Sequence, residues 1–319
     1  MPTVVVTDYT FPDLDFEKTT LNAVNATLIA TPHTTQESLI QSVKDADAVL
    51  VQFAPVTRPV IEAMNRAKVI VRYGIGVDNV DLDAAREKKI PVCNVPDYCI
   101  DEVADHTLAF ILGITRQVVP NTQLIREGNW GLATELGLMS ALRDQTVGLI
   151  GLGRIGQEVA KRLRPFKCRV LVYDPMADEK NISALACQKV ELPQLFSQSN
   201  IISLHCPSTD DTRKIINSDS IAQMQRGSIL INVGRGDLVD TQALEVALAS
   251  GHLSAAAIDV CDPEPIPLES PLRTLPNVIT ASHIASASPT AVQTLRTTAA
   301  EIALKALLGE PLPNIVNGV

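Results

Sequence analysis

The chain has 319 residues, of which 46% are apolar and 20% are charged, and its formal net charge is −9. This length and composition predict a globular protein of two domains, because one hydrophobic core rarely grows beyond about 250–300 residues. The acidic balance argues against a nucleic-acid surface, which requires clustered Lys and Arg side chains.

The cysteines and the apolar pattern indicate a cytoplasmic protein with free thiols. The six cysteines include no C-x-x-C pair, and no basic segment followed by an apolar one opens the chain. No apolar run approaches the roughly 18–20 residues that span a bilayer, so we expect no membrane partner. The five histidines lack the spacing of metal ligands, and we expect no metal.

Residues 1 to about 100 alternate strand-length apolar runs with amphipathic helical segments. The expected strands are 3–7, 27–30, 48–52, 69–72 and 91–94, and the helical segments include 36–43 and 60–65. This alternation predicts a parallel sheet wound with helices. A long helix is then predicted from about residue 101 towards Pro120, where it leads into a second domain.

The second domain continues the same alternation. Its expected strands are 146–150, 169–173, 201–204, 228–233, 255–260 and 278–281. A final long helix over 290–308 has apolar residues on one side and returns the tail to the first domain. Ligands of open parallel sheets bind beyond the carboxyl ends of the strands, so we expect the chemistry in the loops that follow these strands.

The sequence Gly151-Leu152-Gly153-Arg154-Ile155-Gly156 lies between the first of these strands and a helical pattern. An acidic residue, Asp174, ends the next predicted strand, close to the spacing expected for the acid that binds ribose. This context predicts a dinucleotide-phosphate loop, with NAD favoured over NADP because Asp174 repels a 2′-phosphate. The alternative is a crossover with a glycine turn and no ligand.

Three ionisable residues lie in the loops after later strands: Arg235, Glu264 and His283. Reducing a carbonyl by hydride transfer needs a proton donor, a cation that binds the carbonyl or an attached carboxylate, and a carboxylate that keeps the donor protonated. Histidine, arginine and glutamate have these properties. Alternatively, Arg235 is a surface charge, Glu264 a solvated carboxylate and His283 a core histidine.

Together these segments resemble the NAD-dependent D-2-hydroxyacid dehydrogenase family over nearly the whole chain. The resemblance rests on residues 73–81, 151–156 with Asp174, His205-Cys206-Pro207 followed by Thr212, Asn232 to Gly236, and Asp259 with Glu264, Pro265 and His283. It implies an α/β fold of two doubly wound parallel-sheet domains. A Rossmann-type NAD-binding domain of residues 101–284 is inserted into a flavodoxin-like substrate domain of residues 1–100 and 285–319.

The resemblance also implies roles for individual residues, an active site in the cleft and a homodimer formed mainly through the cofactor domains. Arg235 binds a 2-oxo acid, Glu264 supports the acid/base His283, and the backbone around Ile75 and Gly76 holds the substrate carboxylate. Asp259 faces the nicotinamide carboxamide, Arg154 and Ile155 contact the pyrophosphate, and Pro207 and Thr212 lie beside the adenosine. The implied cofactor contacts are Gly151, Gly153, Arg154, Ile155, Gly156, Asp174, His205, Pro207, Thr212, Val233, Gly234, Arg235, Asp259 and His283.

Two features leave alternatives open. Ser282 stands where the family often has Pro before the catalytic histidine, and residues 73–81 and 97–107 are similar to the branch that contains phosphoglycerate dehydrogenases and the C-terminal-binding corepressors. The main hypothesis is therefore a dehydrogenase of a small 2-hydroxy or 2-oxo acid. The alternatives are 3-phosphoglycerate dehydrogenase and an NAD(H)-binding scaffold.

The expected substrate is unphosphorylated, because the loop Gln52-Phe53-Ala54-Pro55 presents an aromatic ring and small apolar residues. A phosphate dianion buried without a partner costs several kcal/mol or more. The cations that could compensate it are Arg58 and Arg72.

Overall fold

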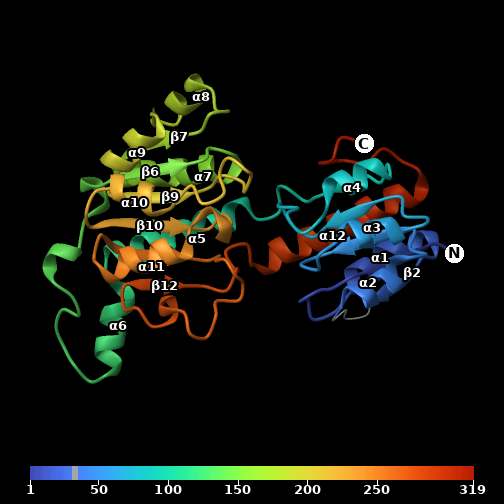
Figure 1. Ribbon diagram of the computed structural model, residues 1–319, viewed down its shortest axis with the longest axis horizontal. Helices are drawn as coiled ribbons and strands as arrows, with labels where there is room; N and C mark the ends of the chain where they lie inside the picture. Colours follow the sequence, from blue (N-terminus) through green and yellow to red (C-terminus); the bar gives the residue numbers. More distant parts are fainter. Residues whose placement is uncertain (31–34) are drawn as a thin grey trace. The chain divides into compact units, whose positions relative to one another are not determined.

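Two parallel sheets organise the chain, and each is the centre of a compact unit. In the computed structural model, residues 1–30 and 35–319 are described (Figure 1). The first unit comprises Met1–Tyr98 and Ser288–Val319, and the second comprises Cys99–Ala287. The second unit is therefore an insertion in the sequence of the first. The sequence predicted boundaries at 100/101 and 284/285.

The first unit contains a five-stranded sheet in the order β2-β1-β3-β4-β5, with every neighbouring pair parallel. Its strands are β1 (Thr3–Val6), β2 (Thr27–Ala30), β3 (Ala48–Val51), β4 (Ile70–Arg72) and β5 (Val92–Cys93). This is the strand order of flavodoxin-like folds. All five strands occur where the sequence predicted them, and the sheet confirms the fold class.

Helices cover both faces of this sheet, which explains why its central strands are continuous apolar runs. They are α1 (Asp15–Leu21), α2 (Gln36–Val43), α3 (Arg58–Ala63), α4 (Leu82–Glu87) and α12 (Pro289–Leu308). One apolar core includes residues of α1 and α12, and the other includes residues of α2, α3 and α4. All four residues of β3 are consequently buried.

The second unit contains a seven-stranded sheet in the order β12-β11-β10-β9-β6-β7-β8, again with parallel neighbours. Its strands are β6 (Thr146–Ile150), β7 (Arg169–Tyr173), β8 (Gln188–Lys189), β9 (Ile201–Leu204), β10 (Ser228–Asn232), β11 (Leu253–Ile258) and β12 (Val278–Thr280). The strand order reverses between β6 and β9, which is the arrangement of a Rossmann fold. Strand β8 was not predicted because it has only two residues, both polar and exposed.

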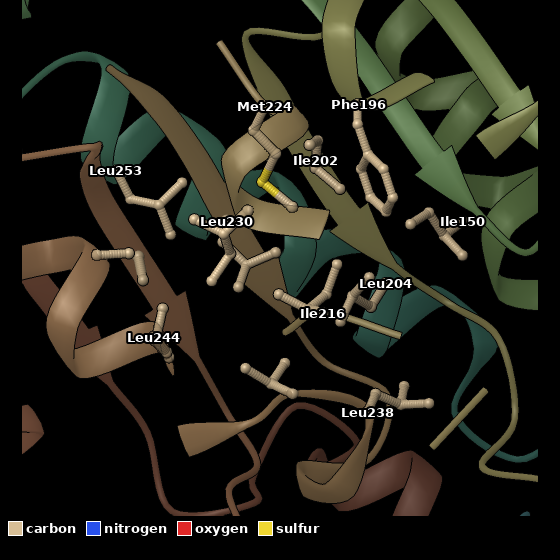
Figure 2. Packing of buried hydrophobic residues seen from close by; sticks show 14 of the residues in the cluster. Ile150, Phe196, Ile202, Leu204, Ile216, Met224, Leu230, Leu238, Leu244 and Leu253 are labelled. Carbon is tan, nitrogen blue, oxygen red and sulfur yellow. The ribbon is translucent and has the colours of Figure 1, made fainter. Parts of the chain in front are cut away.

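The helices of the second unit also cover both faces of its sheet. They are α5 (Ile100–Thr115), α6 (Val118–Arg126), α7 (Arg154–Leu163), α8 (Glu179–Ala184), α9 (Leu192–Gln198), α10 (Ser218–Gln223) and α11 (Thr241–Ala249). Figure 2 shows the apolar core in which strand residues meet the elements that cover one face. The labelled side chains are Ile150, Phe196, Ile202, Leu204, Ile216, Met224, Leu230, Leu238, Leu244 and Leu253.

Short 3-10 helices complete the two units: η1 (Asn22–Val24), η2 (Leu136–Leu138), η3 (Leu142–Asp144), η4 (Arg164–Phe166), η5 (Gly236–Leu238) and η6 (Pro271–Arg273). Within residues 1–30 and 35–319, no helix combines the length and apolarity needed to cross a membrane.

The helix predicted from residue 101 towards Pro120 is in fact two helices. Helix α5 ends at Thr115, and Gln117 adopts a left-handed conformation with φ of 54°. Pro120 then lies in the first turn of α6, where its missing N–H leaves no helical hydrogen bond unmade. The change of direction at Gln117 makes α6 a separate element, which stands off the sheet of its unit (Figure 1).

Candidate functional site

The predicted site residues of the second unit lie in loops at one edge of its sheet. Because the strands are parallel, their carboxyl ends share an edge, and the loops after β6, β7, β9, β10, β11 and β12 all leave the sheet there. The point where the strand order reverses, between β6 and β9, is where open sheets of this kind bind dinucleotides. The glycine sequence follows β6 at this point.

The three glycines have different surroundings. A Cβ on Gly151, whose φ is 95°, would lie 2.6 Å from the backbone nitrogen of Cys206. A Cβ on Gly156 would collide with the carbonyl oxygen of Gly151, whereas one on Gly153 would meet nothing within 4 Å. Gly151 and Gly156 therefore permit close approach of backbone segments, while open space beside Gly153 is left for a ligand. Gly153 is also the N-cap of α7, whose N-terminus attracts negative charge.

Asp174 follows β7 and is held beside the glycine loop by backbone donors. Its Oδ2 accepts a hydrogen bond from Leu152 N at 2.7 Å, and its Oδ1 accepts from Met176 N at 2.8 Å and Ala177 N at 3.1 Å. The carboxylate is thus fixed at the end of the second strand, where a ribose hydroxyl is bound in Rossmann folds. These residues and the space beside Gly153 fit a bound NAD.

The imidazole of His205 contacts a neighbouring strand residue. Its Nε2 lies 2.9 Å from Ser203 Oγ and its Nδ1 is buried, and burial lowers the pKa of His205 to about 4. Its main chain, in contrast, lies against Gly151. Nearby, Thr212 Oγ1 donates to the carbonyl oxygen of Pro207 at 2.7 Å and shapes that exposed loop.

The structure brings His283 and Glu264 together from the loops after β12 and β11. His283 Nδ1 lies 3.0 Å from Glu264 Oε2, and Glu264 Oε1 accepts a hydrogen bond from Cys261 N at 3.1 Å. Burial raises the pKa of Glu264, but the hydrogen bond and charge of His283, the Cys261 N–H and the Arg235 guanidinium together hold that pKa below its ordinary value. Glu264 is therefore a carboxylate whose Oε2 can accept a hydrogen bond from His283 Nδ1 and orient the imidazole.

Arg235 follows β10 in a loop that a buried asparagine shapes. Asn232, which is 1% exposed, accepts from Gly234 N at 3.1 Å and donates to the carbonyl oxygen of Arg235 at 2.9 Å. Arg235 Nη1 donates to the carbonyl oxygen of Gly234 at 2.8 Å. Asn232 did not emerge from the sequence as a functional residue. The available signal was its position as a polar residue directly after the apolar residues Ile229 to Ile231 of β10.

Asp259 holds the main chain at His283. Its Oδ1 accepts from Ile284 N at 2.8 Å and its Oδ2 from Ala285 N at 2.9 Å, and its carbonyl oxygen accepts from His283 N at 2.8 Å. His283 itself has a φ of 57°, a conformation that non-glycine residues adopt only when their surroundings impose it. Asp259 is thus part of the structure that places the imidazole.

Ile75 and Gly76 belong to the first unit, in the loop after β4. The carbonyl oxygen of Ile75 accepts a hydrogen bond of 2.6 Å from Asn94 Nδ2. Asn79 Nδ2 donates to the carbonyl oxygen of Ala54 at 2.9 Å and so joins this loop to the loop of residues 52–55. Asn79 lies within the 73–81 segment on which the family resemblance rests, but neither Asn79 nor Asn94 was assigned a role from the sequence.

The two arginines considered as phosphate ligands differ in their surroundings. Arg58 forms a two-point ion pair with Glu87, with distances of 2.6 and 3.2 Å. The guanidinium of Arg72 fills the space beside Gly74, and its central carbon lies 6.0 Å from the centroid of the Phe53 ring. Of these two arginines, Arg72 is the one whose guanidinium lies near the ring of Phe53 in the 52–55 loop.

The described part of the second unit has the site of a dinucleotide-binding oxidoreductase: a glycine loop at the switch point, an acid after the next strand, and a paired histidine. Residues 108–285 match the family description "D-isomer specific 2-hydroxyacid dehydrogenase, NAD binding domain". The chain belongs to this family, whose cofactor is NAD. Among the residues that the structure describes, no three His, Cys, Asp or Glu side chains are grouped as a metal ion requires.

The relatives of this chain include enzymes named for a phosphorylated substrate and enzymes named for an unphosphorylated one. The chain is 39% identical over 285 residues to the D-3-phosphoglycerate dehydrogenase of Methanocaldococcus jannaschii, covering 89% of this chain and 54% of that protein. It is 36% identical over 282 residues to the glyoxylate reductase of Korarchaeum cryptofilum, covering 88% and 85%. The chain thus spans about half the length of the phosphoglycerate dehydrogenases it matches.

Among solved structures, the D-lactate dehydrogenase of Aquifex aeolicus in complex with NAD and lactic acid is similar over 99% of both chains. The TM-score is 0.90 and the sequence identity is 28%. This similarity agrees with the two-sheet α/β fold.

Proposed function

We propose that the protein is an NAD-dependent oxidoreductase that interconverts a small 2-oxo acid and the corresponding 2-hydroxy acid. The observation that carries this proposal is the 3.0 Å pair of His283 Nδ1 and Glu264 Oε2, located with Arg235 at the sheet edge that also bears the glycine loop. A histidine paired with a carboxylate transfers protons near neutral pH.

In this proposal each residue has one task. Glu264 accepts a hydrogen bond from the Nδ1–H of His283 and thereby orients the imidazole, so that Nε2 gives a proton to the substrate oxygen during reduction and takes it back during oxidation. Arg235 binds the substrate through its guanidinium, which suits both a carboxylate and a polarised carbonyl. When bound, NAD(H) accepts or supplies the hydride.

The cofactor contacts are proposed on the same basis. The open backbone at Gly153 and the start of α7, with Arg154 and Ile155, would receive the pyrophosphate, and Asp174 would accept the ribose hydroxyls. The loop at Ile75 and Gly76 in the first unit would receive the substrate carboxylate.

We further propose an unphosphorylated substrate such as glyoxylate or hydroxypyruvate. Phe53 dominates the 52–55 loop, and Arg58 is already paired with Glu87. A second candidate is 3-phosphohydroxypyruvate, and the position of the Arg72 guanidinium near Phe53 is the observation that favours it. A glyoxylate reductase and a phosphoglycerate dehydrogenase both occur among the relatives, so the comparison of substrates must be made by experiment.

The test is a screen of 2-oxo acids with NADH oxidation followed by absorbance, in which kcat/KM is compared for hydroxypyruvate and its 3-phosphate. We expect activity, with the unphosphorylated acid preferred. His283→Ala should lower kcat by roughly 10²- to 10⁴-fold without loss of NADH binding, because it removes only the proton donor. His252→Ala is the control, since His252 precedes β11 and lies at the opposite edge of the sheet. Wild-type activity in His283→Ala would refute the acid/base role, and a preference for the phosphate would select the second candidate.

We also propose that the protein forms a homodimer through the second unit. Helix α6 has no buried residue, and large apolar side chains on it and after it are exposed, including Ile125, Trp130 and Leu136. Trp130 is 93% exposed. An apolar surface of this kind on a soluble protein usually marks an interface, and most oligomers are symmetric copies of one chain.

A further inference from the structure

A buried ionic cluster joins three distant segments of the first unit. Glu17 of α1 is 0% exposed and Arg296 of α12 is 2% exposed. Arg296 donates to both carboxylate oxygens of Glu17, from Nε to Oε1 at 3.0 Å and from Nη2 to Oε2 at 2.8 Å. Its Nη2 also donates to Asp13 Oδ1 at 2.9 Å, and its guanidinium carbon lies 5.0 Å from the centroid of the Phe11 ring.

The third segment is the chain directly after β4, which contributes Tyr73. The Tyr73 hydroxyl donates to Glu17 Oε1 at 3.2 Å, and the Tyr73 ring packs edge-on against Phe11 with centroids 5.3 Å apart. Tyr73 is only 2% exposed. Burial and the neighbouring Glu17 raise the pKa of Tyr73 well above its ordinary value, so this hydroxyl remains a donor.

Tyr73 is the last residue before the loop of residues 74–76 and the centre of a tight turn. Its N–H still continues the sheet by donating to the carbonyl oxygen of Val51 at 2.8 Å, and Gly74 N then donates back to the carbonyl oxygen of Arg72 at 2.9 Å. These two backbone hydrogen bonds and the side-chain contacts of Tyr73 together hold the residue from which the chain enters Gly74 and Ile75.

A contribution to the stability of the fold does not by itself explain why Glu17 and Arg296 are charged residues. A buried ion pair is often no more stabilising than well-packed apolar residues of similar size, because desolvating the charges costs as much as their attraction returns. An ionic cluster instead imposes geometry. The two-point contact with Arg296 orients the Glu17 carboxylate. The Tyr73 hydroxyl can then donate to Glu17 Oε1 from only one direction.

We propose that Glu17 and Arg296 act as positioning residues that hold Tyr73 and, through it, the substrate-binding backbone at Ile75 and Gly76. The inference rests on the proposed function in one respect, namely that this loop receives the substrate carboxylate. The network sets the affinity for the 2-oxo acid and leaves proton transfer and NADH binding unchanged.

The decisive variant is Tyr73→Phe, which removes only the hydroxyl. The ring still packs on Phe11, and Glu17 keeps both contacts with Arg296, so no buried charge is left unpaired and the fold is retained. Losing a hydrogen bond to a charged group shifts an equilibrium on the order of tenfold. We expect KM for the 2-oxo acid to rise about tenfold, with kcat and the Kd of NADH within about twofold of wild type.

A second measurement does not depend on activity. Amide hydrogen exchange at residues 74–77 should be faster in Tyr73→Phe than in wild type, because the loop loses its anchor, while Tm falls by only about 3–6 °C. The control is Ser42→Ala, which removes the hydroxyl that donates to the carbonyl oxygen of Leu39 at 2.8 Å in α2 of the same unit. This control should leave both KM and exchange at residues 74–77 unaltered.

The outcomes separate the inference from the proposed function. A wild-type protein that reduces no 2-oxo acid would refute the proposed function, while faster exchange in Tyr73→Phe would still support the positioning network. An active wild type with unchanged KM and unchanged exchange in Tyr73→Phe would overturn the network. A fall in Tm without a change in KM would do the same, because it would show only structural support.

Discussion

The glycine sequence after β6 offers a test that separates structural from ligand-binding glycines. In Gly151→Ala, the new Cβ would lie 2.6 Å from Cys206 N, about 0.8 Å closer than the 3.4 Å at which ordinary contact begins. The neighbouring atoms belong to backbone and cannot rotate away. The φ of 95° adds strain, because left-handed conformations cost a residue with a side chain roughly 1–2 kcal/mol.

Together with overpacking of about 1–3 kcal/mol, this strain predicts a loss of roughly 2–5 kcal/mol in the free energy of unfolding of Gly151→Ala. For a unit of this size, each kcal/mol lowers Tm by about 2–4 °C, so we expect a fall of about 4–20 °C. Calorimetry without cofactor measures it directly. A Tm within about 2 °C of wild type would show that the close approach of Gly151 and Cys206 does not constrain residue 151.

Gly153→Ala is the matched variant with the opposite expectation. Its φ of −66° is available to alanine, and nothing lies within 4 Å of the new Cβ, so we expect Tm to fall by only about 1–4 °C. The methyl group would instead enter the space proposed for the pyrophosphate, and NADH should bind roughly 10- to 100-fold more weakly in a fluorescence titration. Unchanged NADH binding would place the pyrophosphate elsewhere.

Three further predictions concern the cofactor, the acid/base pair and the assembly. Asp174→Ala should reduce the preference for NADH over NADPH by at least about tenfold in kcat/KM, because the carboxylate that repels a 2′-phosphate is removed; an unchanged preference would show that Asp174 does not face the ribose. The folded-state pKa of Glu264 is depressed, so its stabilising effect is present above the ordinary value of about 4.3 and is lost as pH falls through the lower folded value. The difference in Tm between wild type and Glu264→Gln should therefore shrink on acidification, and a constant difference would contradict the pairing. Trp130→Asp should convert a dimer to a monomer in light scattering coupled to size-exclusion chromatography, and a wild type that is already monomeric would refute the proposed assembly.

Most strands could be predicted from sequence because the cores on both sheet faces require continuous apolar runs. Elements without such runs were missed. The two polar residues of β8 pair only with the edge of β7, and α1 places the charged Glu17 inward, so neither element has the expected pattern. The break between α5 and α6 was missed because it depends on a left-handed conformation at Gln117, a residue with no strong preference for it.

The residues that would react with the substrate were easier to predict from sequence than the residues that hold their loops in place. Arg235, Glu264 and His283 are the residue types that acid/base transfer and carboxylate binding require, and each follows a strand. The residues that shape their loops are amides and acids with ordinary sequence surroundings. Asn232 makes its two hydrogen bonds within the loop it precedes, so its position at a strand end was a usable signal. Asp259 acts on residues 25 and 26 positions later, which no local pattern reveals.

The same limit applies more strongly to Glu17 and Arg296, which are separated by 279 positions. An acid in a short amphipathic segment is ordinarily read as a solvated residue, because isolated charges are almost never buried. Burial of Glu17 becomes favourable only when the sheet brings α1 beside α12 and the guanidinium satisfies both carboxylate oxygens. The sequence contains both residues but does not reveal that the fold brings them into contact. Charged residues of this kind therefore become candidates for positioning only after the fold is known, whereas residues that meet the substrate can be proposed from type and location alone.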